Sequence, residues 1–129
     1  MVRLLRGSKP PSAPRPMTSQ GTAHGRFTRA LAQRNLFRTE LALREMGTPS
    51  LLVALDYLDL LAEVKPEKLE RAAVRWHGRL EVEAATLTLA ESQLALAALA
   101  SLCAGDTAAL DVLRRLLRRV RPTLLPQTG

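Results

Sequence analysis

The pattern of apolar and polar residues predicts helices throughout the central part of the chain and no strand. Apolar residues recur at intervals of three and four, as on one face of a helix, and no stretch alternates as a half-buried strand does. The predicted helices span residues 27–34, 36–46, 49–64, 66–84, 89–103 and 106–121. We therefore predict an all-α fold, a single small bundle of five to six helices. Stacked αα-hairpins of a helical repeat are the alternative, but no fixed internal period supports them.

Residues 89–103 form the predicted central helix of this bundle. No polar side chain occurs from Leu94 to Ala100, and a helix that is apolar on all sides is typically buried. Thr88 and Glu91 fit a capping box at its start, and Gly105 is well suited to end it in a left-handed conformation. The only cysteine, Cys103, lies in the last turn. We expect it to be a buried, unreactive thiol.

Charge is distributed unevenly along the chain. The net charge of +7 is made up of +5 over residues 1–26, −3 over 27–111 and +5 over 112–129. The N-terminal stretch also contains four prolines and little that could be buried, which is typical of disorder. We predict a disordered basic arm (1–25), a helical bundle domain (26–121) and a C-terminal tail (122–129). The positive charge belongs to the ends, so it does not indicate a nucleic-acid-binding body.

Composition limits the core and the location of the protein. Only 3% of the 129 residues are aromatic, so leucine and alanine must supply most of the packing. The single tryptophan, Trp76, falls on an apolar stripe with Leu69, Ala73 and Leu80, and we predict that it anchors the core. We expect no signal peptide, because only Leu4 and Leu5 follow Arg3 as an apolar run, and no apolar run reaches the ~20 residues that span a bilayer. The expected location is the cytoplasm.

Three segments carry a resemblance to a known group of proteins, namely NLFRTELALREMG from Asn35, ERAAVRW from Glu70 and LTLAESQLALAALA from Leu87. They resemble small all-helical actinobacterial proteins of uncharacterised function. The resemblance covers roughly residues 27–104 and consists mostly of positions expected in the core. It implies a shared helical fold and a GC-rich bacterial source, and it implies no active site, cofactor or partner.

Two rows of charge follow neighbouring predicted helices. Asp56, Asp59 and Glu63 share one side of a helix, a spacing that could hold a hard cation, but we interpret them as a solvated face. The other row is Arg71, Arg75 and Arg79. Counting 100° per residue, both rows point to the same side of an antiparallel helix pair. We therefore expect one row to be exposed and the other to be partly paired.

No motif indicates catalysis. His24 and His77 have no partner that a motif identifies, and the sequence lacks a glycine-rich phosphate loop, paired-cysteine zinc spacing and HExxH. We predict that the protein is not an enzyme and has no catalytic residues, metal or cofactor.

Two surfaces are candidates for binding. The predicted last helix groups arginines opposite its apolar face, an arrangement that suits phosphate or acidic lipid. The second predicted helix has apolar residues over more than one face, which suggests a protein contact. The arginines are Arg114, Arg115, Arg118, Arg119 and Arg121, and the apolar residues are Leu36, Phe37, Leu41, Leu43 and Met46.

The absence of catalytic motifs beside an apolar helical body favours a non-catalytic helical protein-interaction module. Its partner is an unknown protein or a second copy of the chain. The alternative is a nonspecific nucleic-acid or anionic-surface binder that uses the arginine-rich last helix.

Overall fold

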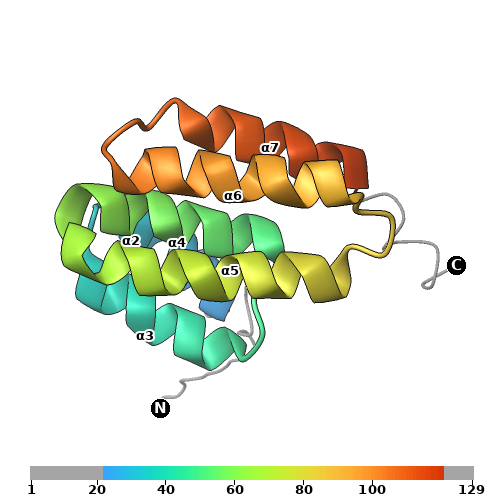
Figure 1. The fold of residues 1–129 in the computed structure, drawn as a ribbon. Helices are drawn as coiled ribbons and strands as arrows, with labels where there is room; N and C mark the ends of the chain where they lie inside the picture. Colours follow the sequence, from blue (N-terminus) through green and yellow to red (C-terminus); the bar gives the residue numbers. More distant parts are fainter. Residues whose placement is uncertain (1–21, 121–129) are drawn as a thin grey trace, which may run out of the picture. The chain divides into compact units, whose positions relative to one another are not determined.

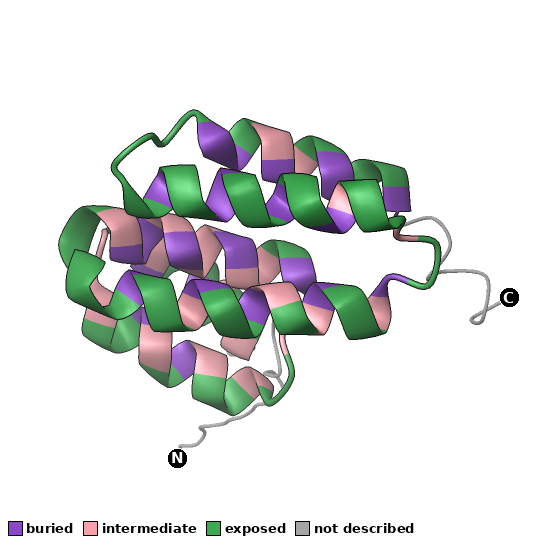
Figure 2. Cartoon of the chain, viewed as in Figure 1, coloured by how far each residue is buried: buried purple, intermediate pink, exposed green. Residues whose placement is uncertain are grey.

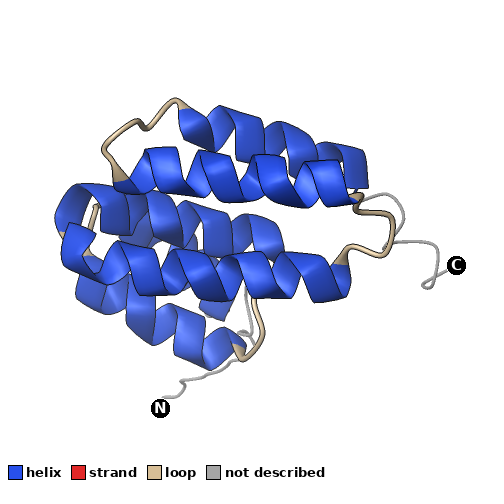
Figure 3. Ribbon diagram, in the orientation of Figure 1, coloured by secondary structure: helices blue, strands red, loops and turns tan. Residues whose placement is uncertain are grey.

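The computed structural model describes residues 22–120, and all regular structure within that range is helical (Figures 1 and 3). The predicted all-α fold with five to six helices is confirmed. A 3-10 turn, η4 (Pro66–Lys68), leads into the fourth of the six α-helices found in this range. The helices are α2 (Ala23–Ala32), α3 (Leu36–Met46), α4 (Leu51–Val64), α5 (Leu69–Glu83), α6 (Leu89–Cys103) and α7 (Ala109–Val120). The predicted arm up to residue 21 and the predicted tail lie outside the described residues.

The chain divides between Thr48 and Pro49 into two compact units. In the first unit, α2 and α3 pack against each other as a hairpin. In the second unit, α5 contacts α4 and α6, and α7 also contacts α4 and α6. The four helices of the second unit therefore close into a ring around a shared core, as in a four-helix bundle.

Local capping signals fix most helix ends. The Thr88 hydroxyl accepts from the Glu91 amide at 3.1 Å, and the Glu91 carboxylate accepts from the Thr88 amide at 2.9 Å. At the other end of α6, Gly105 takes a positive φ of 104°. There its amide bonds the Leu102 carbonyl and the Asp106 amide bonds the Ser101 carbonyl, which together form a Schellman motif. The capping box and the glycine stop that we predicted for this helix are confirmed.

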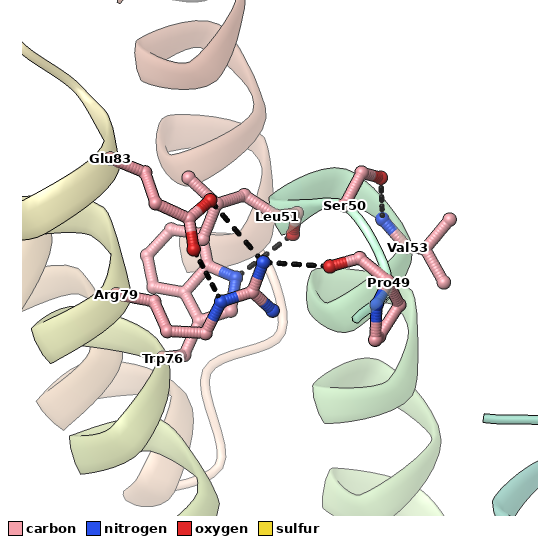
Figure 4. Close-up of polar contacts among 7 residues, drawn as sticks. All are labelled: Pro49, Ser50, Leu51, Val53, Trp76, Arg79 and Glu83. Atoms are coloured by element: carbon pink, nitrogen blue, oxygen red, sulfur yellow. Dashed lines mark hydrogen bonds and ion pairs between the residues drawn. The ribbon is translucent and has the colours of Figure 1, made fainter. Parts of the chain in front are cut away.

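Four of the described helices begin at residues other than those predicted. Helices α5 and α7 each begin three residues later, at Leu69 and Ala109, whereas α2 and α4 begin where a neighbouring side chain provides the cap. Helix α2 begins at Ala23, since the Thr22 hydroxyl accepts from the Gly25 amide at 2.9 Å. Helix α4 begins at Leu51, since the Ser50 hydroxyl accepts from the Val53 amide at 3.1 Å (Figure 4). Serine is a good N-cap, and the predicted start at residue 49 was two residues too early.

Trp76 anchors the second unit, as predicted. Its side chain is 2% exposed, and its indole N–H donates to the Leu51 carbonyl at 2.9 Å (Figure 4). The bond joins α5 to the first residue of α4, 25 positions away. Leucines make up much of the core of this unit, and those almost fully buried are Leu55, Leu58, Leu60, Leu61, Leu80, Leu102 and Leu113.

Helix α6 is not enclosed by its neighbours, which corrects our prediction. Leu94 is 50% exposed and Leu96 is 51% exposed, and exposed positions follow the length of the helix (Figure 2). Cys103 is exposed as well. Within its unit α6 packs mainly against α5 and α7, so the side of α6 that faces away from these helices is left uncovered. The residues it does bury are Ser92, Ala95, Ala98, Leu99 and Leu102.

Replacing Trp76 tests the anchor. Trp76→Phe removes the donor to the Leu51 carbonyl and leaves a void, so we expect the free energy of unfolding to fall by ~1–3 kcal/mol. Urea denaturation followed by circular dichroism measures this change. Val82→Ala, at a position that is 84% exposed, is the control and should stay within ~0.5 kcal/mol of the parent. Equal stability of Trp76→Phe and the parent would contradict the role of the indole.

Candidate functional site

His77, Ser92 and Glu81 form a polar cluster between α5 and α6 that the sequence analysis did not identify. The Ser92 hydroxyl donates to the Glu81 carboxylate at 2.6 Å. His77 Nε2 lies 3.0 Å from the same hydroxyl and 3.1 Å from the Ser92 carbonyl. A carbonyl has no hydrogen to give, so Nε2 must carry the hydrogen and donate.

This cluster does not have the order of groups that nucleophilic catalysis requires. In a catalytic triad the histidine accepts the serine proton and a carboxylate orients the histidine. Here Ser92 lies between the other two and donates its hydrogen bond to Glu81, not to the histidine. Ser92 is also only 7% exposed. The cluster satisfies a buried hydroxyl and links two helices.

The acidic row of α4 is partly paired, and its partner comes from α7. Arg114 lies 3.2 Å from an oxygen of Asp56 and 3.9 Å from an oxygen of Asp59. No group of three histidine, cysteine or acidic side chains within residues 22–120 is arranged to hold a metal ion. The carboxylates that could have suited a cation therefore neutralise an arginine instead.

The arginine row of α5 is only partly exposed. Arg71 and Arg75 are exposed. Arg79 bonds Glu83 of its own helix at 2.7 Å and the Pro49 carbonyl at 2.7 Å (Figure 4). Both rows are therefore partly paired, where we expected one of them to be exposed, and α7 supplies the partner of the acidic row.

The five arginines of the predicted anion-binding face have different surroundings. Arg114 pairs with the acidic row, and Arg119 pairs with Glu91 at the start of α6. Arg115 and Arg118 are exposed and form no ion pair with a described carboxylate. Arg121 lies outside the described residues. Two of the four described arginines are therefore used inside the unit.

A cleft beside α7 has balanced charge. It encloses about 510 Å³, and its ionisable lining residues are Asp56, Glu83, Arg114 and Arg118. Two acids and two bases leave no net charge, and leucines, a valine and Ser50 line the rest. This cleft therefore does not concentrate positive charge for an anion.

The first unit has a groove of its own between α2 and α3, which we call the hairpin groove. It encloses about 410 Å³. Its floor is made by Ala30 and Ala42, which are 3% and 2% exposed, and these small side chains leave space above them. Phe37 and Leu41 of α3 form one apolar wall. The remaining lining residues are polar, namely Arg26, Arg29, Gln33, Arg38 and Glu45.

The structure separates the five predicted interaction residues into two groups. Leu36, Leu43 and Met46 are half-buried. Phe37 is 70% exposed and Leu41 is 41% exposed, and they lie one turn apart on the side of α3 that lines the groove. The sequence analysis missed the alanine floor and the arginines of α2, because it considered the second helix without its partner.

A third groove lies between α5 and α6 and is largely apolar. It encloses about 430 Å³, and Val74, Leu96, Ala100 and Cys103 line it, with Glu70 as its one charged residue. Partial burial raises the pKa of the Cys103 thiol, and the Glu70 carboxylate raises it further. The thiol is therefore accessible but mostly protonated at neutral pH.

No family model, curated protein or solved structure matches this chain. The resemblance to actinobacterial helical proteins accordingly stays a prediction. Between residues 22 and 120, no helix combines the length and the apolar character needed to cross a bilayer.

The raised pKa of Cys103 predicts slow alkylation. Reaction of the dilute protein with iodoacetamide should reach half its maximal rate at a higher pH than reaction of free cysteine, because only the thiolate attacks. Glu70→Gln removes the negative charge beside the thiol, so its profile should move to lower pH. Glu67→Gln, an exposed glutamate that does not line the groove, is the control. A profile unchanged by Glu70→Gln would contradict the assigned cause.

Proposed function

We propose that the protein is a non-catalytic, cytoplasmic protein-interaction module that binds a helical segment of a partner in the hairpin groove. The observation that supports this most directly is Phe37, which is 70% exposed at the edge of a groove with an alanine floor. An exposed aromatic beside a concave apolar surface is typical of a protein contact. The buried position of Ser92 in the one histidine–serine–carboxylate cluster described above supports the non-catalytic part of the proposal.

The groove's composition indicates the chemistry of the partner. A large apolar side chain of the partner fits above Ala30 and Ala42 and covers Phe37 and Leu41. Arg38, which forms no ion pair with any described carboxylate, and Arg29 stand at the rim. Between residues 22 and 48 there are five basic and two acidic residues. A segment with apolar residues one turn apart and acidic residues beside them complements this surface.

Burial of the apolar wall should supply most of the affinity. Covering an exposed phenylalanine contributes ~1.5–3 kcal/mol, whereas ion pairs at an exposed rim contribute ~0–1 kcal/mol each. The rim arginines therefore set the choice of partner and the association rate more than the affinity.

The alternative of an anionic-surface binder has weaker support. Arg114 and Arg119 are engaged with carboxylates of the same unit, and exposed Asp111 stands one turn before Arg115 on α7. The described part of α7 thus offers a phosphate or lipid surface only two unpaired arginines, Arg115 and Arg118.

Selection from a displayed library of helical peptides tests the proposed partner chemistry. We expect enriched peptides to carry large apolar residues at i and i+4 with Asp or Glu beside them. Phe37→Ala should weaken their binding at least ~10-fold, which corresponds to ~1.4 kcal/mol. Arg38→Glu should disfavour the acidic peptides, and Val82→Ala on α5 should leave binding unchanged. Enriched peptides without acidic residues, or peptides that bind Phe37→Ala as tightly as the parent, would contradict the proposal.

A matched pair of double variants tests the alternative. At about 50 mM salt, where phosphate contacts are strong, we expect Arg115→Ala/Arg118→Ala to retain the affinity of the parent for double-stranded DNA within about twofold. The control, Arg71→Ala/Arg75→Ala, removes the same charge from α5. A selective loss of salt-sensitive DNA binding in the α7 variant, with none in the control, would favour the alternative.

A further inference from the structure

The exposed side of α6 carries a regular seam of uncharged residues. Leu89, Gln93, Leu96, Ala100 and Cys103 follow one another at spacings of four, three, four and three, and all five are exposed. This spacing places them in one line along a helix, as in the contact seam of a coiled coil. Leu89 is 77% exposed and Leu96 is 51% exposed, so large apolar side chains of the seam have no cover within the described residues.

The only ionised residue of α6 is already engaged. Glu91 accepts from the Thr88 amide in the capping box and pairs with Arg119 of α7. No other charged residue occurs from Leu89 to Cys103. The outer side of α6 is therefore uncharged along its whole length, in a chain with a net charge of +7.

We propose that the α6 seam is the interface with a second copy of this chain, paired antiparallel across a two-fold axis near Leu96. In a two-fold pair each surface meets itself, so a charged surface would repel its own copy and an uncharged one does not. Leu96 is the middle residue of the seam, and small neighbours such as Ala97 and Ala100 let two helices approach closely.

The groove between α5 and α6 gives the second copy a place to dock. Leu96 and Val74, which is 63% exposed, lie along it, so apolar side chains of one copy can enter the groove of the other. Glu70 lies at the groove together with Cys103, near the end of α6. In an antiparallel pair this end meets the first turn of the other α6, where the helix dipole favours a negative charge.

The area available predicts a weak dimer. The exposed side chains of the seam and of Val74 present apolar surface on the order of 500 Å² per copy, so a pair would bury about 1,000 Å², near the lower limit for a specific interface. We therefore expect the dimer to form in the micromolar range and above.

Sedimentation velocity from about 5 to 500 µM tests the pairing, since this range spans weak dissociation constants. The parent should shift from monomer to dimer with rising concentration. Leu96→Glu and Leu96→Lys should each stay monomeric, because two like charges meet at the axis. An equimolar mixture of these two variants should form a heterodimer, which a folding defect could not produce. Circular dichroism checks that both variants keep the helical content of the parent.

Val82→Glu is the matched control, because it adds the same charge at an exposed site of α5 away from the groove, and it should dimerise as the parent does. A parent that stays monomeric at 500 µM would overturn the proposal, as would dimers that survive Leu96→Glu. Monomeric protein that instead binds neutral phosphatidylcholine vesicles through Leu96 would overturn it in favour of a lipid contact.

Discussion

The packing of the second unit depends on the contact between Trp76 and the beginning of α4. The indole is buried and its N–H bonds the Leu51 carbonyl, while Arg79, one turn further along α5, bonds the Pro49 carbonyl (Figure 4). In a chain with 3% aromatic residues, few other side chains are large enough to fix how two helices align. Once α4 and α5 are aligned, the acidic side of α4 is available to α7, and Arg114 closes the ring by pairing with Asp56.

Ion pairs within the second unit neutralise two of the arginines that had suggested an anion-binding site. The sequence suggested a solvated face for the acidic row and an anion-binding face for the arginine-rich helix, yet Arg114 and Asp56 pair with each other across the unit. Arg119 likewise serves the start of α6 through Glu91. Such partly exposed pairs add little stability, but they reduce the free charge on α7. The remaining candidates for function are apolar surfaces.

The two apolar surfaces differ in chemistry and belong to different units. The hairpin groove places Phe37 beside arginines, which suits an acidic partner and would repel a second copy of the same basic surface. The α6 seam has no charge, which suits a copy of itself and gives a charged partner no electrostatic advantage. One surface therefore fits binding to another protein, while the other fits self-association.

The sequence alone determined the helices, the two caps of α6 and the role of Trp76, because these depend on hydrogen bonds within a few residues and on apolar periodicity. It did not determine which side of α6 is exposed. With leucine and alanine on all sides, α6 has no polar face to show which side meets solvent, and its exposure follows from having α5 and α7 as its main neighbours. The partners of Arg114, the His77–Ser92–Glu81 cluster and the alanine floor of the hairpin groove join residues from separate helices. Only the tertiary structure could reveal these contacts. Helix periodicity shows which residues share one face of a helix, but it does not show which other helix packs against that face.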